Sequence, residues 1–257
     1  MKPSMHVRDA SDQDLPLLTD WLGRRIELPR APHERLLLVE SPDPAMGLLA
    51  TLRLLPAIGL DLPRVSYHVG CTVHAAPELG LFRRQRTLLL GHDHTGASEL
   101  ADIAWSPREL PLSDTALALH TLVQAALRLV TQERQHYAQR LVAELPGPRD
   151  AAGQSPFWQG LGRHFYTGDP AAAAALHGPA WRSHAAALLP RHLLYTSFLP
   201  AAADAAIAQV AGSARVLREV LEEAGLRYAH HINVEDGGPV LEVDLNDLQA
   251  WRHAQGS

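Results

Sequence analysis

The fold of this chain is decided by residues 155–166, which read SPFWQGLGRHFY. Ser155 is a natural N-cap, and Pro156 suits the first turn of a helix, where its missing N–H would have no partner anyway. Three apolar side chains then share one face at helical spacing: Phe157, Trp158 and Leu161. We expect Gly162 to close this helix in a left-handed conformation. Because a short apolar run at 140–145 precedes the segment, the pattern predicts a strand-turn-helix unit in the core.

Working outward, apolar runs and turn signals predict an alternation of strands and helices. The expected strands cover residues 6–10, 36–40, 48–55, 65–73, 88–90, 100–105, 140–145, 193–199, 228–234 and 240–245. The expected helices are one capped by Ser11, one over 113–135, an alanine-rich one over 171–188 and one over 213–224. This order predicts an α/β (α+β) fold, with a mixed, partly parallel β-sheet and helices on both faces.

The composition bounds the class of protein. The 257 residues are 46% hydrophobic and 20% charged, as in a globular protein, and the net charge of -5 gives no electrostatic case for nucleic acid or an anionic membrane. Residues 1–8 lack the apolar run of a signal peptide, and no segment reaches transmembrane length, so the expected location is cytoplasmic. Since composition marks no boundary, we expect a single domain over residues 1–257.

Cysteine and histidine counts limit the metal chemistry that the chain can support. Cys71 is the only cysteine, which excludes an internal disulfide and a cysteine-based metal cage. The 15 histidines are scattered, and only His92/His94 and His230/His231 are close in sequence. His92 and His94 would share a face in a strand, but no third ligand is evident, so we expect no metal site.

Several ordered blocks resemble the arginine N-succinyltransferase family, acyl-CoA enzymes of the GNAT type that open a bacterial route of arginine degradation. The blocks lie at residues 92–100, 144–165, 189–195, 223–228 and 236–242. The resemblance implies one GNAT-like acyltransferase domain with succinyl-CoA as co-substrate and a small amino acid, arginine or ornithine, as acceptor. Because the family includes paralogous subunits that assemble together, it also implies a homo-oligomer or a paralogous partner subunit.

The resemblance places the acyl-CoA beside the strand at 100–105. Ile103 falls at a position that the family uses for acyl-CoA contact, although a plain core strand explains the same residues. The following loop, residues 106–114, contains no glycine, and its Pro111 lacks an N–H. Only Arg108 in this loop favours a phosphate.

Two further residues of the loop count against CoA. Glu109 would repel a phosphate, and Ser113 or Asp114 would cap the same helix amides that a phosphate needs. We therefore expect succinyl-CoA to bind weakly or in an altered pose.

The family's proton-donating histidine has no counterpart in this sequence. Counting back without gaps from Gly225, its position is occupied by Ala211, and Pro146 stands where the family usually has arginine. His192 and His164 are the candidate substitutes, although a lone histidine also fits a structural role.

Four carboxylates are candidates for binding the acceptor, because a guanidinium group pairs bidentately with carboxylates. They are Asp93, Glu99, Glu144 and Asp150. Asp93 with Thr95-Gly96 fits a simple turn equally well. Two functions therefore stay open: an arginine N-succinyltransferase-like enzyme, or a catalytically silent homologue that acts as a partner subunit or binds a small molecule.

Overall fold

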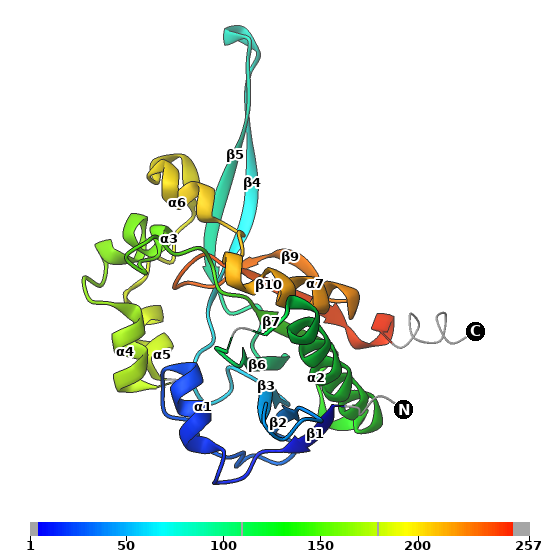
Figure 1. The fold of residues 1–257 in the computed structure, drawn as a ribbon. Coiled ribbons are helices and arrows are strands. Elements are labelled where there is room, and N and C mark those ends of the chain that lie inside the picture. Colours follow the sequence, from blue (N-terminus) through cyan, green and yellow to red (C-terminus); the bar gives the residue numbers. More distant parts are fainter. Residues whose placement is uncertain (1–4, 109, 179, 249–257) are drawn as a thin grey trace.

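The computed structural model describes residues 5–108, 110–178 and 180–248. The strands of this part of the chain form one sheet of ten strands, in the order β1-β2-β3-β6-β7-β10-β9-β4-β5-β8 (Figure 1). Their bounds are β1 His6–Asp9, β2 Arg35–Glu40, β3 Leu48–Leu55, β4 Ser66–Ala76, β5 Leu81–Gly91, β6 Ser98–Trp105, β7 Arg140–Glu144, β8 Leu194–Tyr195, β9 Arg227–Ile232 and β10 Pro239–Asp244. Only β6 and β7 pair in parallel among them, so the expected mixed sheet is confirmed.

Helices cover both faces of the sheet, as the sequence predicted. They are α1 Leu15–Leu22, α2 Leu112–Gln132, α3 Pro156–Gly160, α4 Pro170–His177, α5 Ala180–Leu188, α6 Ala201–Ala206 and α7 Arg215–Glu223. Strand β2 shows the two sides clearly, because Leu36 and Leu38 pack with Leu18 of α1, whereas Leu37 and Val39 join the core around α2. Figure 1 shows α2 and α7 side by side, with α1, α4 and α5 across the sheet from them.

The apolar face of residues 155–162 is buried as expected, but Gly162 has a different role from the one predicted. The Trp158 N–H donates to Ser155 Oγ at 3.1 Å, which confirms the N-cap, and Phe157 and Trp158 are both buried. The expectation of a left-handed Gly162 is wrong, since Gly162 begins a 3-10 turn, Gly162–His164, without a positive φ. A Cβ at Gly162 would lie 2.1 Å from the Trp158 ring, so glycine is required there for close packing.

Three other sequence expectations are corrected. The alanine-rich region forms two helices, α4 and α5, because Gly178 at φ 58° ends the first. In the region 193–199 only Leu194–Tyr195 is strand, because β8 is a short edge strand followed by a 3-10 turn. Helix α1 has Asp14 as its N-cap residue, and Ser11 donates hydrogen bonds to the Asp14 carboxylate instead of capping the helix.

Strands β6 and β7 lie side by side at one end and then diverge. Their described pairs are only Ser98 with Leu141 and Glu99 with Val142. Beyond Glu99, β6 continues to Trp105 along β3 on its other side. The two strands are therefore adjacent at one end and splayed beyond it, which opens the middle of the sheet.

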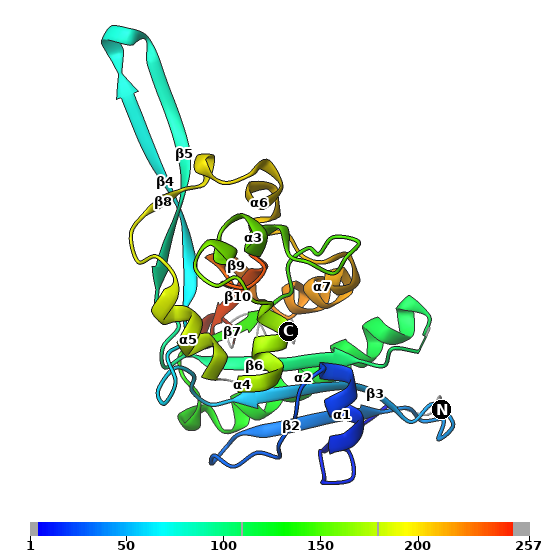
Figure 2. The ribbon, with the colours of Figure 1, turned by 90° about the vertical axis from the view of Figure 1, so that its left-hand side faces the viewer.

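A long β-hairpin projects from the molecule, as Figures 1 and 2 both show. Strands β4 and β5 pair along their full length, from Ser66 with Gly91 to Ala76 with Leu81. Other strands pair with the hairpin only near its base, where β9 meets Tyr67 and His68 and β8 meets Thr87 and Leu88. We call residues 69–86 the β4–β5 arm.

Candidate active site

One face of the sheet carries polar side chains where β6 and β7 begin to diverge. Strand pairing aligns two rows across this face, Glu99–Val142–Glu242 and Glu144–Val240–His231. Side chains that pair across neighbouring strands point to the same side of a sheet. Leu141, Ala143 and Leu241 alternate with these residues and belong to the core around α2. The two rows therefore lie on the face opposite α2, which we call the polar sheet face.

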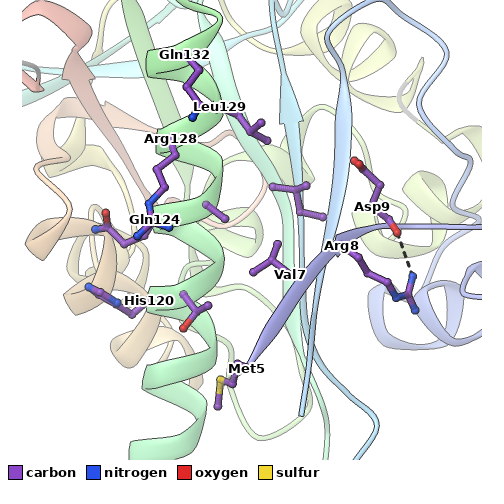
Figure 3. A pocket seen from close by; sticks show the side chains of 12 residues that line it. Met5, Val7, Arg8, Asp9, His120, Gln124, Arg128, Leu129 and Gln132 are labelled. Atoms are coloured by element: carbon purple, nitrogen blue, oxygen red, sulfur yellow. Dashed lines mark hydrogen bonds between the residues drawn. The ribbon is translucent and has the colours of Figure 1, made fainter. Parts of the chain in front are cut away.

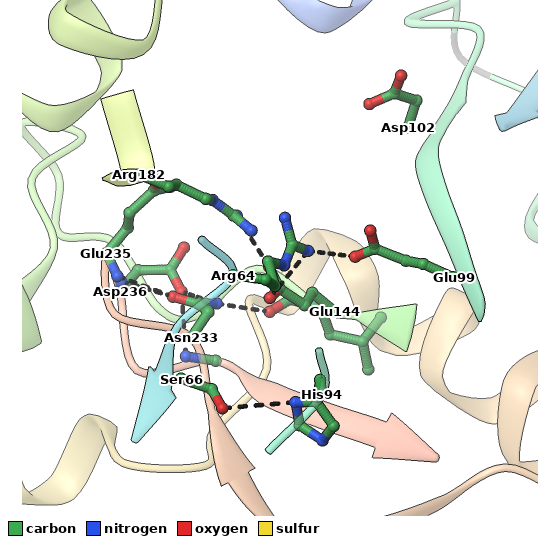
Figure 4. Close-up of polar contacts among 12 residues, drawn as sticks. Arg64, Ser66, His94, Glu99, Asp102, Glu144, Arg182, Asn233, Glu235 and Asp236 are labelled. Carbon is green, nitrogen blue, oxygen red and sulfur yellow. Dashed lines mark hydrogen bonds and ion pairs between the residues drawn. The ribbon is translucent and has the colours of Figure 1, made fainter. Parts of the chain in front are cut away.

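Two of the predicted carboxylates, Glu99 and Glu144, meet on this face (Figure 4). Arg64, from the connection before β4, pairs with Glu99 and lies 2.9 Å from Glu144 Oε1. Arg182 of α5 lies 2.8 Å from Glu144 Oε2 and 3.3 Å from a Glu235 oxygen. We call Arg64, Glu99, Glu144 and Arg182 the charge cluster, and its arginines come from segments that no local sequence pattern connected to the carboxylates.

Burial and ion pairing shift the pKa values of the charge cluster in opposite directions. Burial raises the pKa of Glu99, and the Arg64 charge offsets this only in part. Burial also opposes ionisation of Glu144, but Arg182 and Arg64 outweigh it and hold the pKa of Glu144 below its usual value. For Arg182, burial is outweighed by Glu144 and Glu235, which raise its pKa. The carboxylates are thus matched by the chain's own arginines, and a cationic acceptor must compete with them.

A β-bulge lies in β6 directly beyond the charge cluster. Asp102 and Ile103 together oppose Leu52 of β3, and Asp102 has a φ of 49°. Arg24 and Arg53 both pair with the Asp102 carboxylate, the latter at 2.9 Å through Nε. Ile103 is half-buried and packs against the core around α2. The bulge therefore fixes the backbone of β6 where its edge leaves β7.

Arg108, the expected phosphate ligand, has its guanidinium directed elsewhere. Its Nη1 donates to the carbonyl oxygens of Ala45 at 3.3 Å and Met46 at 3.2 Å, in the connection between β2 and β3. Because the side chain is exposed, these bonds hold it only lightly.

The N-terminus of α2 differs from the sequence expectation. Its N-cap residue is Pro111, and no side chain caps it, so the expected capping by Ser113 or Asp114 is wrong. Glu109 lies outside the described residues. Among the described residues, no side chain accepts from the backbone amides of the first turn, which favours anion binding there more than the sequence suggested.

His164 and His192, the predicted proton carriers, are both exposed. No contact of the described residues joins either imidazole to the charge cluster. Ala211, which a count without gaps places at the family's histidine position, donates its N–H to the Pro146 carbonyl at 2.8 Å. The two departures from the family pattern are therefore neighbours, directly beyond the end of β7.

Asp150 and Asp93 occupy different settings. Asp150 is exposed, and its Oδ1 accepts from the N–H groups of Ala152 and Gln154, both at 2.9 Å, as in a turn-capping residue. Asp93 Oδ2 lies 3.3 Å from His231 Nε2 at the border of the polar sheet face. The structure therefore brings Asp93, but not Asp150, into contact with this face.

Sequence reasoning missed a second cluster on the same face, formed by His94, His231 and Glu242. His94 Nε2 lies 3.3 Å from Glu242 Oε2, and the two imidazole rings are 4.5 Å apart. Burial and the neighbouring His94 lower the pKa of His231. His94 is far in the sequence from His231 and Glu242, and only the strand register could have shown that the three residues lie together. We call them the histidine cluster.

A cavity of about 530 Å³ lies between β1 and α2 (Figure 3). Met5, directly before β1, and Val7 of β1 line one side, and His120 and Arg128 of α2 line the other. Because it lies on the α2 side of the sheet, it is separate from the polar sheet face.

Comparison with known proteins identifies the family. A sequence model described as "Arginine N-succinyltransferase beta subunit" matches residues 29–250. The chain belongs to the arginine N-succinyltransferase family. Proteins named arginine N-succinyltransferase from Salmonella paratyphi B and Salmonella typhimurium are each 34% identical to this family member over 239 residues. These matches cover 93% of this chain and 67% of each relative, so the chain spans about two thirds of their length.

A solved structure shares the fold of this arginine N-succinyltransferase homologue. The arginine/ornithine succinyltransferase subunit AI from Pseudomonas aeruginosa superposes with a TM-score of 0.76 and 20% identity, covering 97% of this chain and 79% of that one. Among the described helices, none has the length and apolar character needed to span a bilayer.

Proposed function

We propose that this chain is an acyl-CoA N-acyltransferase of arginine catabolism, which transfers a succinyl group from succinyl-CoA to the α-amine of arginine or ornithine. The proposal takes residues 1–257 as one GNAT-like domain in the cytoplasm. The observation that carries it is the position of the charge cluster, next to the point where β6 and β7 diverge. An acyl group held in this opening would meet an amine bound on the polar sheet face.

On the donor side, the pantetheine arm would run along 100–105, past the bulge at Asp102 and Ile103. The CoA phosphates would lie at the N-terminus of α2, where no side chain of the described residues accepts from the amides. Arg108 would have to release the carbonyls of Ala45 and Met46 to reach them.

On the acceptor side, the charge cluster offers groups of both signs, as a zwitterionic amino acid requires. Arg64 and Arg182 suit an α-carboxylate, and Glu99 and Glu144 suit a guanidinium or ammonium group. Asp93 would extend this surface, whereas the contacts of Asp150 favour a structural role.

The chemical step requires a neutral amine. The amine nitrogen attacks the thioester carbonyl, the new C–N bond forms, the C–S bond breaks, and CoA leaves as its thiol after taking up a proton. His164 and His192 are the proposed proton carriers, and their exposure lets them exchange protons with solvent.

A second function is favoured by the pair Ala211 and Pro146. Alanine cannot transfer a proton, and its place beside the end of β7 corresponds to a position close to the proposed site. On this alternative, the chain is a catalytically silent homologue that assembles with a second copy or with a paralogous subunit, or binds a small molecule.

The test follows release of CoA thiol from succinyl-CoA with L-arginine or L-ornithine as acceptor. Because Cys71 is exposed and would react with a thiol reagent, the assay uses the Cys71→Ser background. We expect turnover that Glu144→Gln lowers at least about 100-fold through lost positioning, while the exposed Glu223→Gln serves as a matched control. Absence of turnover by the chain alone would contradict the proposal.

Two variants separate the alternatives. If the chain is silent because of Ala211, the Ala211→His variant should gain activity, since a positioned acid–base group contributes about 10²–10⁴-fold. If His164 or His192 carries the proton, replacing it with alanine should lower turnover by a similar factor and leave the affinity for succinyl-CoA unchanged.

Affinity for CoA provides an independent measurement. Because the loop before α2 contains no glycine and includes Pro111, we expect binding about two orders of magnitude weaker than a full phosphate-binding loop gives. Titration calorimetry with CoA measures this, and a low-micromolar dissociation constant would show that the uncapped α2 N-terminus is sufficient.

A further inference from the structure

The histidine cluster has the composition of a transition-metal site. His94 lies in the turn after β5, His231 in β9 and Glu242 in β10. One ligand atom of each lies within 4.8 Å of the other two. A tetrahedral Zn²⁺ with bonds of about 2.0–2.1 Å places its ligands about 3.3–3.5 Å apart, so the 3.3 Å between His94 Nε2 and Glu242 Oε2 already fits. His231 needs only a small side-chain rotation.

Hydrogen bonds to the other ring nitrogens orient both histidines. His231 Nδ1 lies 2.9 Å from the Ala229 carbonyl oxygen, which only accepts, so Nδ1 carries the proton and Nε2 presents its lone pair. His94 Nδ1 lies 3.4 Å from Ser66 Oγ, and this hydroxyl can accept from Nδ1 and leave Nε2 to bind a metal. A backbone carbonyl, as beside His231, is one of the usual outer partners of a metal-binding histidine.

The polar atoms around His231 need a cation between them. Its Nε2 lone pair faces Asp93 Oδ2 at 3.3 Å, and two acceptors at that distance repel unless a proton or a metal lies between them. Among the residues that the structure describes, the arginine in contact with this group is Arg140, whose Nε lies 3.8 Å from Glu242 Oε2 and whose Nη1 donates to the Asp93 carbonyl at 3.3 Å. Arg140 therefore partly balances Glu242 and leaves the gap between Asp93 and His231 unfilled.

The backbone is shaped to bring these groups together. Ala229 and His230 form a bulge against β10, with His230 at a φ of 62°, and this turns His231 onto the polar sheet face. At position 91, a Cβ would lie 2.7 Å from Asp93 Oδ2, so glycine there leaves room for the Asp93 carboxylate. The Asp93 side chain is 52% exposed, which provides an entry path for an ion.

We propose that His94, His231 and Glu242 bind one divalent transition-metal ion of the Zn²⁺ type. The fourth position is open to water, or to the half-exposed Asp93 carboxylate after a rotation of its side chain. Two imidazoles and carboxylates are a ligand set that Zn²⁺ accepts. The sequence paired His94 with His92 and showed no further ligand, because the partners of His94 come from β9 and β10. Such an ion would join the turn after β5 to β9 and β10, next to the charge cluster.

The test is a zinc titration of the chelator-treated full chain against a chromophoric chelator at neutral pH. We expect one saturable site with a dissociation constant of about 1 µM or tighter, and a rise in thermal midpoint on adding Zn²⁺. His231→Gln and Glu242→Gln should each weaken binding at least about 100-fold and abolish the midpoint shift. The matched control is His92→Gln, an exposed histidine of the same turn, which should bind as the wild type does.

Circular dichroism in the presence of chelator checks that each variant is folded, and His94→Gln replaces any variant that is not. X-ray absorption at the zinc edge should show two imidazole ligands. The proposal is overturned by the absence of a saturable site, or by zinc binding that His92→Gln removes but His231→Gln does not. It is also overturned if the NMR spectrum of the imidazole nitrogens shows His231 protonated on both and unchanged by Zn²⁺. None of these measurements depends on catalytic turnover.

Discussion

The charge cluster and the histidine cluster occupy neighbouring positions on the polar sheet face, separated by Val142 and Val240. In the charge cluster, each carboxylate has an arginine within ion-pair distance. In the histidine cluster, lone pairs and carboxylate oxygens face one another, with one arginine at the border. The charges of the charge cluster are paired within the protein, without a ligand. The histidine cluster lacks a positive charge, which a bound metal ion would supply. The same sheet face can therefore hold a self-sufficient ion-pair network and a cation site.

A matched pair of glutamate variants tests this comparison most strongly. Glu144→Gln should destabilise the fold by about 3–5 kcal/mol, because Arg64 and Arg182 would stay buried without their shared countercharge. Urea denaturation measures the change, with Glu223→Gln as an exposed control expected within about 0.5 kcal/mol. A loss of less than about 1 kcal/mol for Glu144→Gln would show that water reaches the cluster.

A substitution in the aromatic core gives a loss of stability from an apolar site, with which the loss for Glu144→Gln can be compared. Trp158→Ala should cost about 3–5 kcal/mol by opening a cavity beside Gly162 and Trp181. Trp158→Phe should cost much less, since the buried indole Nε1 has no hydrogen-bond partner among the described residues. Thermal denaturation of both variants compares them, and equal losses would point to an indole hydrogen bond that forms in solution.

The histidine cluster should respond weakly to the same chemical change. In the presence of chelator, Glu242→Gln should alter stability by no more than about 1 kcal/mol, because the new amide can donate to or accept from His94. Its second partner, Arg140, is half-exposed and loses little. A loss as large as that of Glu144→Gln would remove the distinction between the two clusters.

The smallest expected effect is a difference in pH dependence. Because burial raises the pKa of Glu99 above 4.5, the folded state binds the proton more tightly, and this residue adds stability as the pH falls from neutral toward that value. Glu144 acts oppositely, since its lowered pKa adds stability that is present above about 4.5 and lost below it. Glu99→Gln should therefore flatten the change in unfolding free energy between pH 5 and 7 by roughly 0.5–1 kcal/mol. Urea denaturation at both pH values measures it, and an unchanged slope would mean that Arg64 keeps Glu99 ionised.

Much of the fold followed from local sequence patterns. The run at 48–55 was placed correctly because it is short, mostly apolar and bounded by turn signals, as is typical of a strand covered on both faces. The run at 193–199 failed because it is equally apolar but lies at the edge of the sheet, where pairing depends on β5. Gly162 failed because its role depends on the ring of Trp158 and not on backbone conformation.

Residues of the site could be predicted only where a single continuous segment of the sequence resembled the family. Glu99 and Glu144 were found because they lie in blocks that resemble the family. Arg64 and Arg182 were missed because they lie far in the sequence from the carboxylates that they contact. Arg64 comes from the connection before β4, and Arg182 comes from helix α5. His231 and Glu242 were missed for a related reason: the alternation of β9 and β10 gives their face, but not the register that places them beside His94.

The β4–β5 arm has a consequence for local opening. Its distal strands pair only with each other, and Leu79 and Phe82 near the tip are largely exposed. A two-stranded hairpin without a core is only marginally stable, so its distal amides should exchange with deuterium long before those of Tyr67 and Leu88 at the base. Unzipping would stop at the base, where β8 and β9 begin to pair, and a cut at Gly80 would leave the body of the protein folded.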